Sequence, residues 1–244
     1  MRISIFTGRD CDPKRIVAVK KAIVTASREY RANLLVLPGN SLGSGRNQDG
    51  ILQELADKNK VSILAEVDRA TSLFRPSKQP RQFCAQQFAV SPSNKKHKDK
   101  RVTPCKVRKL IELLNNGDRI FKLAGKRIAV LLCGENNILH NIRAEADVAH
   151  PRYNDIEWPF DVYDVLVNST HTSMGHWNLL HKRFAYFSRG DRTAVHCTNN
   201  THRVWGTSLC VYQNGSRSVM GNLENYGMLP THIENNWRMV TIEV

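Results

Sequence analysis

A cysteine, a glycine and a carboxylate follow directly after a continuous apolar run. Residues 128–132 are all apolar, and Cys133, Gly134 and Glu135 come next. Such a run predicts a strand buried on both faces, and in α/β sheets chemistry collects where strands end. A thiol at this point could be a nucleophile, with Gly134 leaving room for a substrate and a backbone amide cradling an oxyanion. Packing is the alternative, because a buried cysteine is often a small core residue.

Strand and helix patterns alternate on both sides of this run, which predicts an α/β layered fold in one domain spanning residues 1–244. Helical spacing or capping predicts helices at 13–30, 49–58, 137–146 and 175–188, and a single helical turn at 109–115. Short apolar or alternating runs predict strands at 1–6, 34–38, 61–67, 83–90, 126–133, 163–168, 193–197, 207–212, 216–221 and 237–244.

Composition excludes several classes of protein. With 244 residues and 41% hydrophobic content the chain can bury a sizeable core. It contains no run of 18 apolar residues, so no membrane span is expected. The six cysteines have no CxxC spacing, so neither a zinc site nor a disulfide framework is expected, and a reduced, cytoplasmic compartment is the interpretation. No phosphate-loop or dinucleotide motif is present, so no metal and no cofactor is expected.

Charge is the unusual quantity, because 36 Lys and Arg against 22 Asp and Glu give a net charge of +14. The segment from Lys95 to Lys109 is strongly basic, with Asp99 as its only acidic residue. Lys95, Lys96, Lys98 and Arg101 could contact nucleic acid there. No aromatic residues are interleaved, so contacts to phosphate rather than to bases are expected, and a solvated loop is the alternative.

The order of these motifs resembles the nitrilase superfamily, the carbon–nitrogen hydrolases, over nearly the whole chain. The resemblance is carried by residues 34–38, the Cys133 strand, residues 163–168, the helix that ends in Arg189-Gly190-Asp191-Arg192, and residues 194–199 and 206–212. It implies an α-β-β-α sandwich that often pairs into a homo-oligomer through a helical face. It also implies hydrolysis of a small amide or nitrile by a Glu, a Lys and a Cys.

The resemblance places the nucleophile on Cys133 and the catalytic lysine on Lys100, four residues before Pro104, with Lys98 as the other candidate. Glu135 matches an acidic residue that is common two positions after the nucleophile and is more often structural than catalytic.

The general base does not carry over, because Gly39 follows Pro38 where the family has glutamate. An unassisted thiol with a pKa of ~8.5 is only a few per cent thiolate at neutral pH. Glu112 and Glu135 are candidate replacements. The alternative to an amidase is a non-catalytic module of the same fold that binds a ligand or, through its basic surface, nucleic acid.

His171, which follows a predicted strand together with His176, and Trp158 are further candidates for binding a substrate. Two histidines without a third ligand are more often polar loop residues than a metal site, and a large aromatic residue more often fills the core.

Overall fold

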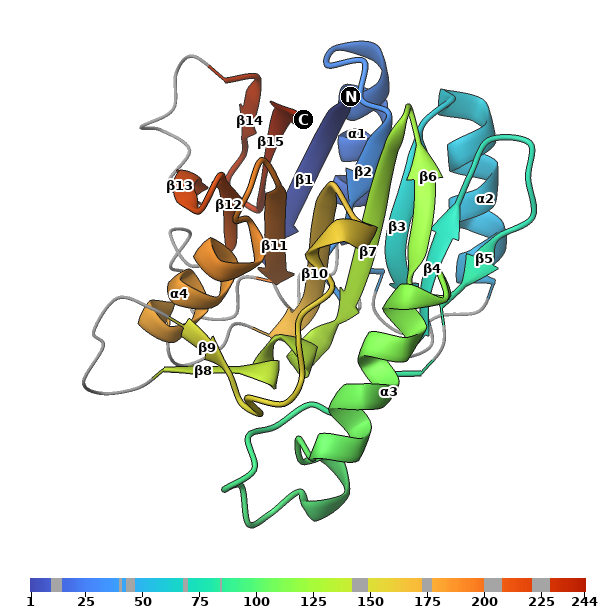
Figure 1. Cartoon of the computed structure of the whole chain (residues 1–244). Coiled ribbons are helices and arrows are strands. Elements are labelled where there is room, and N and C mark those ends of the chain that lie inside the picture. Colours follow the sequence, from blue (N-terminus) through green and yellow to red (C-terminus); the bar gives the residue numbers. More distant parts are fainter. Residues whose placement is uncertain are drawn as a thin grey trace.

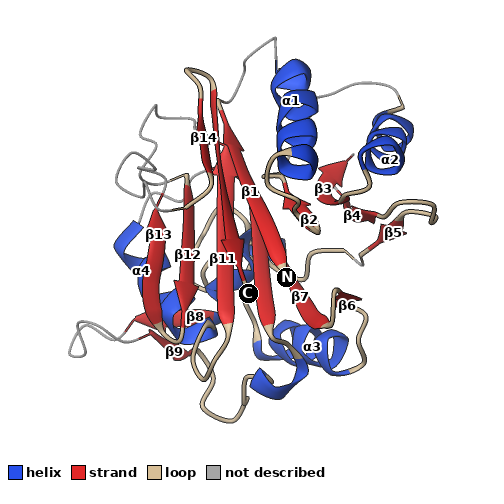
Figure 2. Cartoon of the chain, turned by 90° about the horizontal axis from the view of Figure 1, so that it is seen from above, coloured by secondary structure: helices blue, strands red, loops and turns tan. Residues whose placement is uncertain are grey.

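The computed structural model describes residues 1–9, 15–39, 41–42, 47–67, 70–83, 85–141, 149–172, 177–199, 208–220 and 229–244. Two large β-sheets pack face to face, and helices cover the outer face of each sheet (Figures 1 and 2). The α-β-β-α sandwich expected from the sequence is therefore confirmed. None of the described helices has the length and apolar character that crossing a bilayer requires.

The first sheet has the strand order β14-β15-β1-β2-β3-β4-β5. Its strands are β1 (Arg2–Gly8), β2 (Leu34–Val36), β3 (Ser62–Val67), β4 (Ala70–Phe74), β5 (Arg81–Gln82), β14 (Thr231–Ile233) and β15 (Trp237–Glu243). Strands β1, β2 and β3 run parallel, because the helices α1 (Arg15–Arg28) and α2 (Gln48–Asn59) return the chain between them. Both helices pack on the outer face of this sheet through an apolar cluster that includes Val19, Ile23 and Leu52.

The second sheet has the order β13-β12-β11-β10-β7-β6 and carries Cys133 at the end of its strand β7. Its strands are β6 (Ile120–Leu123), β7 (Lys126–Leu132), β10 (Val165–Thr172), β11 (Thr193–Asn199), β12 (Leu209–Gln213) and β13 (Ser216–Met220). The helices α3 (Pro104–Asn115) and α4 (Trp177–Phe187) cover its outer face. Strand β7 runs parallel to β10, and β10 runs parallel to β11, so the carboxyl ends of all three meet at one edge.

Apolar residues from both sheets fill the space between them. Ile3, Ile5 and Val36 of the first sheet meet Val130, Val167 and Val195 of the second in one buried cluster. Alternate residues of the same strands, such as Ala129 and Leu131 of β7, face α3 and α4 instead. This explains why β7 is a continuous apolar run rather than an alternating one, since both of its faces are buried.

Two sequence expectations are wrong for reasons that concern the site. The described residues of the range expected as a strand at 83–90, namely 83 and 85–90, form no extended strand beyond the isolated bridge of Val90 with Arg101; instead, the amide of Gln87 donates to the carboxylate of Glu135. A helix was expected at 137–146, but its described part forms the end of a 3-10 turn, η2 (Cys133–Ile138), and the short strand β8 (Leu139–Asn141). Strand β8 pairs with β9 (Ala149–Pro151) in a small separate hairpin.

Candidate functional site

Cys133 lies at a sharp turn between β7 and η2. Its φ is +20°, which an L-residue other than glycine rarely adopts, and its side chain is half-buried. Strained backbone of this kind persists only where the surrounding structure fixes it, and it clusters at functional sites. The thiol is therefore held at a strand end and remains within reach of solvent.

Glu135 is fully buried, and its carboxylate is used entirely in holding this turn. It accepts hydrogen bonds from both terminal nitrogens of Arg119, at 3.0 and 3.1 Å, and from the backbone amides of Leu132 at 2.9 Å and Gln87 at 2.8 Å. Burial raises the pKa of the Glu135 carboxyl group, while Arg119 and the two amides oppose that shift. These contacts give Glu135 a positioning role.

Gly134 lies where the backbone of Ala89 packs closely against the Cys133 turn. A Cβ atom there would lie 2.0 Å from the carbonyl oxygen of Ala89. The space that the sequence analysis assigned to a substrate is therefore occupied by backbone, and that expectation is wrong. Asn137 reinforces the approach, because its Nδ2 donates to the carbonyl oxygens of both Ala89 and Gly134, each at 2.9 Å.

The same contact brings the main chain of Lys100 towards the Cys133 turn. The amide of Ala89 donates to the carbonyl oxygen of Lys100 at 2.9 Å. The side chains of Lys98 and Lys100, in the 3-10 turn η1 (Lys98–Lys100), are both exposed. The main chain of Lys100 is therefore linked to the Cys133 turn through Ala89, which contacts both Lys100 and Gly134.

Gly39 lies where the two sheets meet, at the ends of β10 and β11. Its amide donates to the carbonyl oxygen of Thr170 at 2.9 Å, and its carbonyl oxygen accepts from Asn199 Nδ2 at 2.6 Å. Ser169, which precedes Thr170, is the partner of Leu132 in the β7–β10 pairing. The buried Gly39 is therefore near the end of β7, although it lies 94 positions earlier than Cys133 in the sequence.

Asn168 links the ends of β7 and β11, and the sequence analysis missed it. Its Nδ2 donates to the carbonyl oxygens of Leu131 and Cys133, each at 3.0 Å. Its Oδ1 lies 3.0 Å from both Asn136 Nδ2 and His196 Nδ1. Burial lowers the pKa of His196 to about 3, so the ring is neutral and donates from Nδ1. The signal in the sequence was that Asn168 is a polar residue within a buried strand, which could have indicated a buried hydrogen-bond network.

The other described thiols differ from Cys133. Cys197 and Cys210 are fully buried, and burial raises the pKa of each well above its usual range. Cys105 is exposed at the start of α3. Cys133 alone among the described cysteines combines partial exposure with a strand-end turn.

The remaining candidates lie elsewhere or outside the described residues. Trp158 is buried, packs on Phe187 with ring centres 4.9 Å apart and donates from Nε1 to the hydroxyl of Tyr163, a placement that favours its packing alternative. Glu112 is an exposed residue of α3 that pairs with Lys109 at 3.0 Å. The backbone of His171 belongs to β10, whereas its side chain and the whole of His176 are outside the description. Among the described residues, no three His, Cys, Asp or Glu side chains could hold a metal ion together.

Comparison with solved structures finds proteins whose fold is similar to that of this chain. A mutant amidase from Nesterenkonia sp. AN1, with acrylamide added to its active-site cysteine, has a TM-score of 0.56 at 13% identity, covering 100% of this chain and 93% of its own. A CN-hydrolase superfamily protein from Xanthomonas campestris, with an arsenic adduct in its active site, has a TM-score of 0.55 at 13% identity, covering 100% and 91%. No protein-family model and no curated protein matches the chain. The similarity therefore establishes a nitrilase-superfamily type of fold over the full length of the chain.

Proposed function

We propose that this chain is an amidase-type carbon–nitrogen hydrolase with Cys133 as its nucleophile. The observation that carries the proposal is the strained, half-buried Cys133 at the carboxyl end of β7. The structural neighbours support it, since the same mutant Nesterenkonia amidase carries acrylamide on its active-site cysteine in one structure and the acetamide moiety of fluoroacetamide there in another.

In the proposed reaction the thiolate of Cys133 attacks the amide carbon and forms a carbon–sulfur bond. The carbonyl π electrons move onto oxygen, and the charge of this intermediate is stabilised by the ammonium group of Lys100, with Lys98 as the alternative. The proton that the thiol released on ionisation reaches the nitrogen through solvent, the carbon–nitrogen bond breaks, and the amine leaves. Water then hydrolyses the thioester and restores the thiol.

Proton transfer limits the proposed activity, because Gly39 has no side chain. Glu135 is held by Arg119 and two amides, and Glu112 pairs with Lys109 on the surface, so neither supplies the base. Loss of a general base typically lowers a rate by ~10²–10⁴-fold. We therefore expect slow turnover with accumulation of the acyl-enzyme, since hydrolysis of the thioester also needs an activated water.

The test compares four proteins on a panel of small amides and nitriles: the parent, Cys133→Ala, Gly39→Glu and Gly39→Gln. We expect Gly39→Glu to raise kcat by at least tenfold, whereas Gly39→Gln, which has nearly the same size and no base, should not. The Cys133→Ala protein should be inactive. Absence of turnover and of acyl-enzyme in both the parent and Gly39→Glu would overturn the proposal and favour a non-catalytic binding module.

A further inference from the structure

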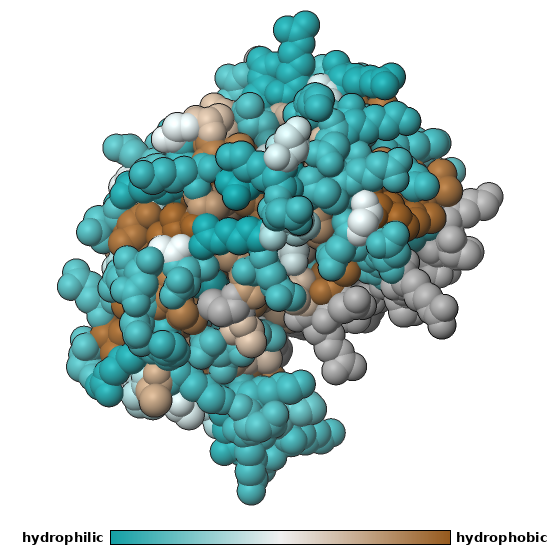
Figure 3. Space-filling view, turned by 90° about the vertical axis from the view of Figure 1, so that its right-hand side faces the viewer, coloured by the Kyte–Doolittle hydropathy of each residue, from teal (hydrophilic) through white to brown (hydrophobic). Residues whose placement is uncertain are grey.

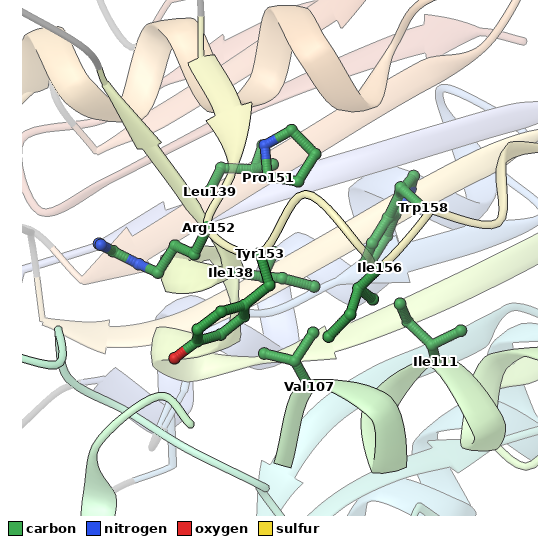
Figure 4. A pocket seen from close by; sticks show the side chains of 9 residues that line it. All are labelled: Val107, Ile111, Ile138, Leu139, Pro151, Arg152, Tyr153, Ile156 and Trp158. Atoms are coloured by element: carbon green, nitrogen blue, oxygen red, sulfur yellow. The ribbon is translucent and has the colours of Figure 1, made fainter. Parts of the chain in front are cut away.

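Four basic side chains gather where the β8–β9 hairpin meets α4. His140 and His150 are directly opposed in the hairpin, so their side chains share one face, and Arg152 follows on the same face two residues after His150. Arg183 comes from α4, which packs against both strands. Figure 4 shows the guanidinium of Arg152 directed away from Ile156 and Trp158, which line the neighbouring apolar cavity.

Arg183 is 96% buried, yet its contacts are to neutral groups. Its Nη1 donates to the side-chain oxygens of Asn136 at 2.7 Å and Asn137 at 3.0 Å, and its Nε has no hydrogen-bond partner among the described residues. Arg152 is half-buried and donates from Nε to the carbonyl oxygen of Asn137. The buried Nδ1 atom of His140 likewise has no hydrogen-bond partner in the part of the chain that the structure describes.

Within the described part of the chain, neither Arg152 nor Arg183 forms an ion pair with a carboxylate. Burial, with Arg152 as the second cause, lowers the pKa of Arg183 to about 10. Burial also lowers the pKa of His140, and Arg152, His150 and Arg183 lower it further. A buried cation normally has a paired anion, because taking a charge out of water is costly unless it is compensated.

We propose that Arg183, Arg152 and His140 form a binding site for the carboxylate or phosphate group of a small molecule. The unpartnered Nε of Arg183 and the ring of His140 offer donors to such a group, and arginine suits both anions because its donors lie in one plane. The site adjoins the Cys133 turn, because Asn136, which accepts from Arg183, also donates to Asn168. It does not depend on Cys133 acting as a nucleophile.

The experiment measures the melting temperature of the full chain against increasing concentrations of phosphate, acetate or succinate at constant ionic strength, with chloride as the reference. An anion that binds only the folded state raises the melting temperature in a saturable way. Comparison of phosphate with the two carboxylates distinguishes the sources of the anionic group. Isothermal titration with the anion that gives the larger rise then yields the affinity.

Three variants make the result specific. Arg183→Met should lower the affinity by about 10–100-fold, since it removes charge-assisted hydrogen bonds, and Arg152→Gln, which changes a more exposed residue, should lower it by about tenfold. Lys78→Met removes the same charge from an exposed loop and should leave the affinity unchanged. An equal response in all four proteins would show a general salt effect and would overturn the proposal.

Glu145 and Asp147 stand between β8 and β9 in the sequence, and a carboxylate of the chain itself is the competing explanation. The parent would then fail to respond to any anion, and the response would emerge in Glu145→Gln/Asp147→Asn. That outcome overturns the proposal. A saturable response in the parent that is unchanged in this double variant supports it.

Discussion

Arg119 and Arg183 are both buried beside the Cys133 turn, and they are compensated in opposite ways. Arg119 is fully buried and is held by both carboxylate oxygens of Glu135. Arg183 is almost as buried, but its hydrogen bonds within the described residues go to the amide oxygens of Asn136 and Asn137. The charge of Arg119 is therefore neutralised by a carboxylate, whereas Arg183 keeps a buried donor, its Nε, without a hydrogen-bond partner among the described residues. The difference separates the part of the site that fixes the thiol from the part that could hold a ligand.

Breaking the closed pair should have the largest effect on stability. Glu135→Gln leaves Arg119 charged and unpaired in the core, so we expect a loss of ~3–5 kcal/mol in the free energy of unfolding, measured with urea. Glu112→Gln, which breaks an exposed pair with Lys109, is the matched control and should cost ~0–1 kcal/mol. Similar losses in both variants would mean that Glu135 does not hold the turn.

The pH dependence of stability should be carried in part by His196. Its folded pKa of about 3 lies below the unfolded value of ~6.5, so its neutral form stabilises the fold above pH ~6.5, and this contribution is lost progressively as the pH falls towards 3. Between pH 7 and pH 5 the parent should lose about 2 kcal/mol more than His196→Gln. Equal losses, measured by urea unfolding at both pH values, would contradict the burial of a neutral ring.

Replacing Arg183 tests whether this residue is compensated differently from Arg119. Without added anions, Arg183→Met should change the free energy of unfolding by no more than about 1 kcal/mol, because the loss of two amide contacts is offset by removal of an uncompensated buried charge. Arg119→Met, which leaves the buried carboxylate of Glu135 without its cation, should lower the free energy of unfolding by ~3–5 kcal/mol under the same conditions. Equal costs for the two arginines would show that Arg183 has a strong partner.

Exposed cations should have the smallest effect on stability. Lys95, Lys96 and Lys98 are exposed, and Figure 3 shows a hydrophilic projection at the lower end of the molecule, where Figure 1 places the segment before α3. The triple variant of these lysines to Gln should stay within ~0.5 kcal/mol of the parent.

If these lysines contact nucleic-acid phosphates, the same triple variant should weaken polyanion binding and flatten its dependence on salt. An equal loss of charge on other exposed lysines, Lys20→Gln/Lys78→Gln/Lys122→Gln, is the control. Identical salt slopes for the two triple variants would assign the binding to net charge rather than to this segment.

Local patterns predicted the frame of the site but not the contacts that hold it. The apolar run before Cys133 predicted β7, and helical spacing predicted α1, because burial on one or both faces leaves a periodic trace. The strand β4 and the turn that leads from α3 into β6 were not predicted from the sequence. Helix α3 is longer than the single turn expected near residues 109–115, since Thr103 caps it and Pro104 begins it.

The missed contacts of the site join residues that are distant in sequence. Arg119 meets Glu135 across 16 positions and Arg183 meets Asn136 across 47, so no short motif contains either pair. The polar pair Asn136-Asn137 directly after the cysteine turn was a local signal that could have indicated a buried network. The crowding at Gly134 could not be predicted, because it depends on where the chain places Ala89.

The rate of alkylation of Cys133 as a function of pH, followed peptide by peptide by mass spectrometry, tests whether this cysteine is an activated nucleophile. Cys105 is the exposed reference, and the buried Cys197 and Cys210 should not react in the folded protein. An activated nucleophile predicts a Cys133 thiol pKa well below ~8.5 and a rate above that of Cys105 at neutral pH. An ordinary pKa, or no reaction of Cys133 in the folded state, would contradict the assignment of this turn as a catalytic site.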